Sequence, residues 1–249
     1  MHVTRIGLAP LKGTRHLDRR SVDLTPAGPV GDRVFCLVDP ARRRVLRTVE
    51  NPSLVRTAVR WRDGELCTEL PTGPVTGVPE PTGETRTVDY WGRQAAVEVV
   101  GGPWAEAYSR HLDHDVELVR SAPGEIVYGA PVSLVTTSSL GRLSAATGGV
   151  VDEAAFRATF TFDTDDEPAH VEDSWVGRRL RIGEAEVRVR ALIARCAVVD
   201  LDPTTGERRN DVLAALAGYR RAAGEIVFGV DAVVVGPGRV DVDAVVERV

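Results

Sequence analysis

Apolar and polar residues alternate along most of the first hundred positions, and this alternation restricts the possible fold more than any other feature of the chain. β-Branched residues are frequent there, and side chains two positions apart in a strand point to the same face. The pattern predicts strands at residues 3–8, 34–38, 54–61, 65–70, 85–90 and 95–99. Turn residues separate them, and a stretch at 71–83 is rich in proline and glycine. Many short strands with such turns predict a barrel or a sandwich.

The second half of the sequence shows the same tendency, with strand patterns at 132–136, 160–163, 179–182, 186–192, 198–201 and 230–235. Helix signals are limited to residues 103–112, 138–146 and 210–223. The predicted fold class is therefore mainly β with a few helices, a β-rich α+β chain. We expect an N-terminal β-barrel-like domain at 1–100, a connecting helix and joint at 101–122, and a second domain at 123–249. No long linker separates the halves, so we expect them to pack face to face.

The charge of the chain excludes some classes of partner. Its 31 cationic and 36 acidic residues give a formal net charge of −5, so the protein as a whole does not attract nucleic acid or an anionic membrane surface. It lacks the run of about 18 apolar residues that a membrane helix needs. Charged residues interrupt the first twenty positions, which therefore do not resemble a signal peptide. We expect a cytoplasmic protein that acts on a small molecule, with neither nucleic acid nor membrane as a partner.

Several common motifs are absent from the sequence. It contains no GxGxxG, GxxxxGK[ST], GxSxG or HExxH pattern, which removes the usual support for nucleotide folds, esterases and zinc proteases. His111 and His114 lack a third ligand at useful spacing, and a solvated helix end is the commoner interpretation of such a pair. The cysteines Cys36, Cys67 and Cys196 form no CxxC pair, so they indicate reduced thiols rather than a disulfide framework or a zinc site.

Two residues stand out as chemical candidates. Cys196 follows the strand predicted at 186–192 and lies beside Arg195, whose charge favours the thiolate form. Taken alone, this segment is more often a buried structural cysteine. Lys12 is the single lysine among 31 cationic residues. An isolated lysine marks a site that needs a compact ammonium rather than a planar guanidinium, although one leftover lysine by chance explains the count equally well.

The order of short segments along nearly the whole chain resembles the MOSC superfamily. The likeness is to members with an N-terminal β-barrel, which include the mitochondrial amidoxime-reducing component and its bacterial relatives. It implies a MOSC-associated β-barrel at 1–100 packed on a MOSC β-barrel at 123–249. The segments that carry it are Leu-Ala-Pro-Leu-Lys-Gly at 8–13, Gly-Asp-Arg-Val-Phe at 31–35, Arg-Thr-Val-Glu-Asn-Pro-Ser-Leu at 47–54, Phe-Arg-Ala-Thr-Phe at 156–160, Glu-Asp-Ser-Trp at 172–175, Arg-Cys at 195–196, Asp-Pro-Thr-Thr-Gly at 202–206, Phe-Gly at 228–229 and Pro-Gly at 237–238.

The resemblance implies a molybdenum cofactor and a set of residues that hold it. Relatives that bind the cofactor ligate molybdenum with the cysteine of the Arg-Cys pair, and a thiolate suits a soft centre of this kind. Cys196 is then the metal ligand and the catalytic residue. Gly13 and Thr159 depart from the family, which often has serine and asparagine at these positions, so contacts to the phosphate and the pterin are altered or retuned. The implied cofactor-binding residues are Lys12, Arg33, Arg47, Arg157, Thr159 and Arg195.

The function implied by the resemblance is that of a molybdenum-cofactor-dependent oxidoreductase that reduces N-hydroxylated or other N-oxygenated small molecules. Its electrons would come from a separate flavin, haem or iron–sulfur protein, since the chain has no cluster motif of its own. Two alternatives stay open at this point. One is a molybdenum-independent cysteine enzyme that uses Cys196 for persulfide transfer or C–S bond chemistry. The other is a non-catalytic module that binds the cofactor.

Overall fold

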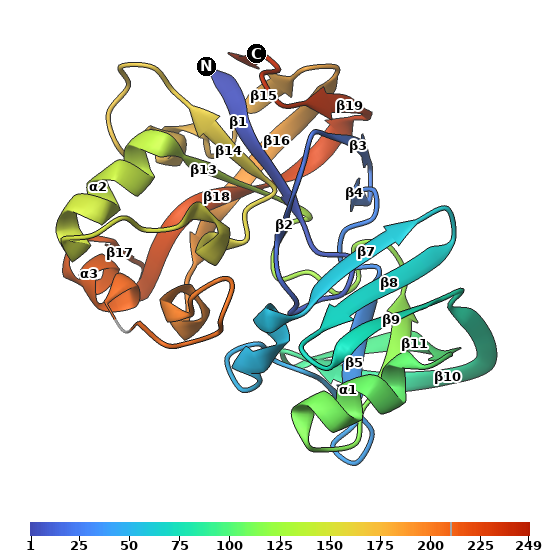
Figure 1. The fold of residues 1–249 in the computed structure, drawn as a ribbon. Helices are drawn as coiled ribbons and strands as arrows, with labels where there is room; N and C mark the ends of the chain where they lie inside the picture. Colours follow the sequence, from blue (N-terminus) through green and yellow to red (C-terminus); the bar gives the residue numbers. More distant parts are fainter. Residues whose placement is uncertain (210) are drawn as a thin grey trace.

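The computed structural model describes residues 1–209 and 211–249, so the first residue of the helix predicted at 210–223 lies outside the described residues. Strands dominate the described chain, which has three α-helices and four short 3₁₀ helices. The predicted fold class, mainly β with a few helices, is confirmed. Figure 1 shows two lobes beside each other, with both chain ends at the top of the same lobe.

The first lobe contains a closed barrel in the strand order β10-β11-β12-β5-β6. The ring closes where β6 runs parallel to β10, with Arg44 opposite Asp89. The sheet β7-β8-β9 and helix α1 pack against the barrel through an apolar cluster that includes Phe35, Leu66 and Trp104. The elements of this lobe are β5 (Phe35–Asp39), β6 (Arg44–Val45), η1 (Pro52–Arg56), β7 (Ala58–Arg62), β8 (Glu65–Leu70), β9 (Gly73–Gly77), β10 (Glu80–Tyr90), β11 (Arg93–Gly101), α1 (Trp104–Leu112) and β12 (Glu117–Ser121).

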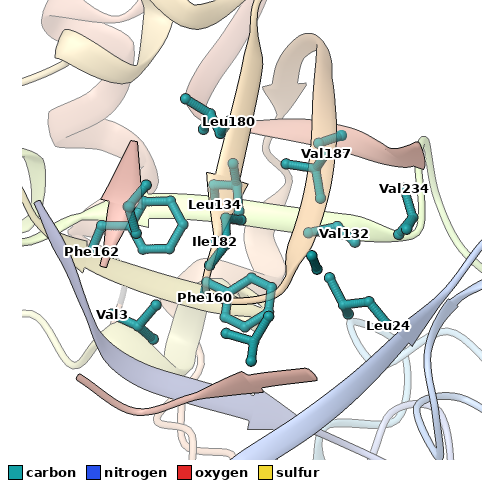
Figure 2. Close-up of a cluster of buried hydrophobic side chains, with 14 of the residues drawn as sticks. Val3, Leu24, Val132, Leu134, Phe160, Phe162, Leu180, Ile182, Val187 and Val234 are labelled. Carbon is teal, nitrogen blue, oxygen red and sulfur yellow. The ribbon is translucent and has the colours of Figure 1, made fainter. Parts of the chain in front are cut away.

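The second lobe is built on a sheet in the order β2-β1-β14-β13-β18-β16-β15-β20, with β17 paired to β18. The sheet curls until its ends approach, since His2 bridges Val245. Figure 2 shows the apolar side chains that fill the curl, among them the fully buried Leu134, Phe160 and Ile182. Each such side chain stabilises the fold by about 1.5–3 kcal/mol relative to exposure. The strands are β1 (His2–Leu8), β2 (Leu17–Arg19), β13 (Val132–Thr136), β14 (Phe160–Asp163), β15 (Arg179–Ile182), β16 (Ala185–Ala194), β17 (Arg221–Ala222), β18 (Glu225–Gly236) and β20 (Val246–Arg248).

The first strands of the chain share their core with the second lobe. β1 pairs antiparallel with β14, with Ile6 opposite Phe160, and the buried side chains of Val3 and Ile6 belong to the apolar cluster of that lobe. A small sheet β19-β3-β4 adds β3 (Ser21–Thr25) and β4 (Gly28–Pro29) to β19 (Gly238–Asp241). These strands fall within the range 1–100 assigned to the first domain, but their buried faces complete the other core. The division at 101–122 stays a prediction.

The helices begin and end for local reasons. α2 (Thr137–Thr147) is capped by Thr136, whose Oγ1 accepts from the Ser139 N–H at 3.3 Å. α3 (Val212–Tyr219) ends before the predicted position because the next residues form β17. None of the helices in the described chain is long and apolar enough to cross a bilayer.

Two predicted strands are wrong in part. The range 54–61 starts inside the 3₁₀ helix η1, and only its second half forms β7. The range 198–201 falls largely in η4 (Ala197–Asp200). Both turns are closed by local backbone hydrogen bonds, from Thr57 N–H to Leu54 O at 3.0 Å and from Leu201 N–H to Val198 O at 3.2 Å. Apolar β-branched residues suit a strand and a buried 3₁₀ turn alike, so the pattern did not separate the two.

Candidate functional site

A cavity of about 280 Å³ lies between the two lobes. Its wall combines the segment after β1, two turns of the first lobe and the end of β16. Five of the seven residues predicted from the sequence line this cavity: Lys12, Arg33, Arg157, Arg195 and Cys196. A concave site with a few polar groups on a mainly apolar wall is the usual form of a small-molecule site.

Lys12 is held on the wall by contacts with the first lobe. Its backbone N–H donates to Phe35 O at 2.9 Å, and its Nζ donates to Leu46 O at 3.2 Å. Burial lowers the pKa of the ammonium to about 8, and the nearby charges of Arg157 and Arg33 add to this effect. Because a nearby anion stabilises the charged form, the position favours a negatively charged ligand.

Gly13 has a structural reason to replace the serine of the family. Its backbone is left-handed, with φ +94°, which L-residues other than glycine rarely adopt. A Cβ at this position would lie 3.0 Å from Leu54 Cδ1 and 3.2 Å from Thr48 Oγ1. A serine would be strained by this backbone conformation and would press on both side chains, so glycine is favoured, and any ligand contact from residue 13 comes from its backbone.

Arg33 is fixed between two segments that face the cavity. It occupies a left-handed position just before β5, and its N–H donates to Ala9 O at 2.9 Å. Its guanidinium forms an ion pair with the buried carboxylate of Asp32, which also accepts from the Ala9 N–H at 2.9 Å. Nη2 lies 3.5 Å from Arg157 O. The ion pair orients the guanidinium on the wall and offsets part of its charge.

Arg157 provides a cation with unused hydrogen-bonding capacity. It follows the 3₁₀ helix η2 (Glu153–Phe156) in a left-handed conformation, and its Nη1 donates to Thr14 O at 2.7 Å. Its Nη2 is buried and has no partner among residues 1–209 and 211–249. Burial, followed by the charge of Arg33, lowers its pKa to about 10, so it stays cationic at neutral pH. An unpartnered buried donor costs about 1–3 kcal/mol. An acceptor on a ligand would remove that cost.

Arg195 positions the end of β16 and the residue that follows. Nε donates to Phe228 O at 2.8 Å, and Nη1 donates to Phe156 O at 3.0 Å. The guanidinium also lies over the Phe156 ring, 5.2 Å from its centroid. Nη2 is buried without a hydrogen-bond partner in the described part of the chain. Arg195 thus adds a second free guanidinium N–H close to the cavity wall.

Cys196 presents its thiol to solvent at the cavity. It ends the extended segment of β16 and precedes η4, and its side chain is exposed. Cys36 is buried and Cys67 is partly buried, and neither lines the cavity. The interpretation of Cys196 as a buried packing residue is therefore wrong. The thiol is accessible to a ligand bound in the cavity.

The two remaining predicted residues do not line the cavity. Arg47 stacks on the indole of Trp91, with its guanidinium carbon 4.3 Å from the ring centroid, so it contacts a lining residue without lining the cavity itself. Thr159 is buried, and its Oγ1 accepts from the Ser133 N–H at 3.1 Å. Because Ser133 does line the cavity, Thr159 acts on the wall through this hydrogen bond.

Sequence reasoning missed the aromatic part of the wall. Tyr90, Trp91 and Tyr128 line the cavity, the first from the end of β10 and the others from two turns. Burial raises the pKa of Tyr90 to about 12, so its hydroxyl stays protonated. The available signal was the tryptophan in the short Tyr-Trp-Gly-Arg turn, where small polar residues are more usual.

The donor set fits a cofactor that supplies most of its own metal ligands. No group of three or more His, Cys, Asp and Glu side chains that could hold a metal ion occurs within the described ranges. A dithiolene-bound molybdenum needs little more than the one sulfur that Cys196 offers. Lys12 and the free N–H groups of Arg157 and Arg195 are suitable donors to an anionic phosphate. The residues present therefore fit a molybdenum cofactor.

A family model and a curated relative each match more than half of the chain. The family model described as the MOSC domain matches residues 107–247, more than half of the chain. The molybdenum cofactor sulfurase of Oryza sativa subsp. japonica is 23% identical over 269 aligned residues. That alignment includes 92% of this chain but 32% of the relative, so the chain spans about a third of the length of the curated relative it matches.

Solved structures with a similar arrangement include two bacterial proteins. The YUAD protein from Bacillus subtilis is 11% identical, with 98% of this chain and 93% of that chain covered and a TM-score of 0.46. YiiM from Geobacillus stearothermophilus is 17% identical, with 48% of this chain and 54% of that chain covered and a TM-score of 0.37.

Proposed function

This chain belongs to the MOSC domain family, and from that premise we propose that it is a molybdenum-cofactor oxidoreductase that reduces N-hydroxylated and other N-oxygenated small molecules. One observation carries the proposal: the exposed thiol of Cys196 shares a cavity with Lys12, Arg33 and Arg157. A soft sulfur donor among cations suits a cofactor that combines a soft metal with an anionic phosphate. The name of the Oryza sativa relative, molybdenum cofactor sulfurase, supports the same choice of cofactor.

The side chains of the cavity have separable tasks in this proposal. Cys196 offers its sulfur as the protein ligand, and the hydrogen bonds of Arg195 to two backbone carbonyls hold the segment that carries it. Arg157 offers an unpartnered N–H, and Lys12 offers a compact positive charge that is largely present at neutral pH, below its pKa of about 8. When bound, the cofactor would supply two-electron oxygen-atom transfer.

The proposed reduction of an N–OH group requires a source of electrons. Replacing an N–OH group by N–H breaks the N–O bond, consumes two electrons and two protons, and releases one water. The described cysteines are separate from one another and form no cluster site. The proposal therefore includes a separate electron donor that contains flavin, haem or an iron–sulfur cluster.

A second candidate function is sulfur transfer through Cys196. It is favoured by the exposure of that thiol and by the word sulfurase in the name of the relative. In this case the Cys196 thiolate attacks a donor persulfide, takes over its outer sulfur and releases the donor thiol. This step needs no molybdenum, so metal content distinguishes the two functions.

The test is the metal content and activity of the full chain made in a host that produces the cofactor. Molybdenum per chain is measured by mass spectrometry, and pterin by fluorescence after oxidation. Cys196→Ser is compared with Cys67→Ser, a matched control in β8 whose side chain is outside the cavity. We expect wild type and Cys67→Ser to hold molybdenum near one per chain. Cys196→Ser should hold at least about tenfold less molybdenum, since mutating residues that only hydrogen-bond to a metal ligand already lowers metal affinity by this factor.

Reduction of an amidoxime with a chemical electron donor completes the test. Wild type and Cys67→Ser should turn over, and Cys196→Ser should not. Sulfur transfer would be supported instead if the wild type held no molybdenum and gained one sulfur atom on Cys196 after exposure to a donor persulfide. A chain that holds the cofactor but does not reduce any N-oxygenated compound would be a binding module.

A further inference from the structure

Two exposed aromatic side chains from different parts of the chain meet at the cavity. Trp91 is 41% exposed and Tyr128 is 61% exposed, and both line the cavity. Their ring centroids lie 5.9 Å apart with an interplanar angle of 65°, an edge-to-face contact. No other tryptophan or tyrosine is this exposed among the described residues. We call Trp91 and Tyr128 the aromatic lip.

The backbone of Trp91 indicates that the residue is retained for something other than the fold. It lies in the turn between β10 and β11 with φ 55°, followed by Gly92 with φ 80°. Such a turn favours asparagine or glycine, and a bulky residue at positive φ is a genuine outlier. Backbone strain of this kind gathers at functional sites. The Arg47 guanidinium, 4.3 Å from the centroid, supports the indole on one face.

Arg93 connects the two halves of the aromatic lip. It begins β11, two residues after Trp91, and its Nη2 donates to Val127 O at 2.9 Å and to Glu125 O at 3.3 Å. Val127 immediately precedes Tyr128, so these bonds tie the loop that carries Tyr128 to the hairpin that carries Trp91. The guanidinium also lies over the Tyr90 ring, 5.2 Å from its centroid. Arg93 therefore sets the spacing of the two aromatic rings.

From this geometry we infer that the aromatic lip binds a planar aromatic ring of the substrate, and that Arg93 is its positioning residue. Trp91 and Tyr128 then determine specificity, favouring aromatic over aliphatic compounds. That the reacting group is an N–O bond rests on the proposed function, whereas the preference for a ring rests on the lip alone. Each stacked or edge-to-face aromatic contact strengthens binding roughly 3- to 10-fold.

The position of the lip distinguishes the substrate from the cofactor as the source of the ring. A pterin is also planar, so either could supply the same stacking. The cations suited to the phosphate, Lys12 and Arg157, are only partly exposed on the wall of the cavity. Trp91 and Tyr128 are instead open to solvent. A cofactor held at these cations leaves the lip for a molecule that enters from outside.

The test measures ligand affinity by calorimetry on the full chain, with benzamidoxime as the aromatic probe and acetamidoxime as the aliphatic probe. Trp91→Leu and Tyr128→Leu should each weaken the binding of benzamidoxime roughly 3- to 10-fold and leave the binding of acetamidoxime unchanged. Tyr128→Phe keeps the ring and should keep the affinity. Arg93→Met should lower the ratio of benzamidoxime affinity to acetamidoxime affinity. Arg93→Lys retains a hydrogen-bond donor and should partly restore this ratio.

Folding and cofactor loading are followed on the same variants. Trp91→Asn suits the left-handed turn, so it should melt no lower than wild type while losing the benzamidoxime preference. Pterin content should stay unchanged in Trp91→Leu and Tyr128→Leu. Equal affinity of wild type for both probes, an equal loss for both probes in the leucine variants, or a fall in pterin content would overturn the inference. Because affinity is measured apart from turnover, a chain without molybdenum activity can still show the preference, and the proposed function can then fail alone.

Discussion

Replacing Gly206 by alanine tests how closely the two lobes are held around the cavity. Gly206 closes the turn after η4, where its N–H donates to Asp202 O at 2.9 Å. The turn packs against η1 of the first lobe, and Arg15 Nη2 donates to Thr204 O at 3.2 Å in the same region. A side chain at position 206 would therefore press on the contact that joins the lobes.

Two effects determine the expected loss of stability. Gly206 has φ +74°, a left-handed conformation that costs an L-residue about 1–2 kcal/mol. The added Cβ would lie 3.0 Å from Pro52 C and 3.0 Å from Val55 Cγ2, and closer still to Pro52 O. The obstacle is mainly backbone, which cannot rotate away as a flexible side chain can. Such overpacking costs about 1–3 kcal/mol, so the free energy of unfolding should fall by about 2–5 kcal/mol in all.

Urea unfolding of Gly206→Ala is compared with that of Gly224→Ala, the matched control. Gly224 also has a left-handed backbone, with φ +87°, but a Cβ there would meet no heavy atom of the described chain within 4 Å. The control should lose only the backbone contribution of about 1–2 kcal/mol, and Gly206→Ala should lose about 1–3 kcal/mol more. Equal losses in the two variants would refute the packing of this turn against η1.

Three further expectations concern single side chains. Lys12→Met should be more stable than wild type below pH 8, because the buried ammonium costs free energy there. The advantage should shrink as the pH rises from about 8 toward the ordinary pKa of about 10.4, since only the unfolded wild type holds the proton in that range; urea unfolding across the range checks this. Glu172 accepts from Ser139 and Thr136, and burial raises its pKa. Between acidic and neutral pH the wild type loses stability, because its buried carboxyl must ionise, whereas the amide of Glu172→Gln does not ionise. Glu172→Gln should therefore gain stability relative to wild type as the pH rises. Thermal unfolding of both proteins at acidic and at neutral pH checks this. Cys196→Ser should change the free energy of unfolding by no more than about 0.5 kcal/mol, since the thiol is exposed, while abolishing the fastest reaction with maleimide.

Local alternation predicted individual strands well and their partners not at all. The range 65–70 was predicted as a strand and forms β8. β1 was also predicted, but its pairing with β14 joins residues far apart in the chain, and no local pattern reveals that. The 3₁₀ helices at Pro52–Arg56 and Ala197–Asp200 were missed because short apolar runs have no period that separates a strand from a tight helical turn.

The charged part of the site was easier to predict than its aromatic part. The resemblance drew attention to Lys12, Arg157 and Cys196 through short motifs, and these residues line one cavity. Trp91 is an unusual residue for a tight turn, which is the one local signal, whereas the residues around Tyr128 indicate only a loop. Their proximity depends on how the loop before Tyr128 packs on the first lobe, where Ile126 joins the apolar cluster of Val88 and Tyr90, and on Arg93 bonding to that loop from more than thirty positions away.

X-ray absorption at the molybdenum edge shows whether Cys196 supplies the protein ligand of a cofactor held in this cavity. The loaded wild type and the loaded Cys67→Ser control should show the same number of sulfur neighbours around the metal. Whatever metal Cys196→Ser retains should show one fewer. An unchanged sulfur count in Cys196→Ser, or a chain that takes up no molybdenum in a cofactor-producing host, would refute the assignment of Cys196 as this ligand.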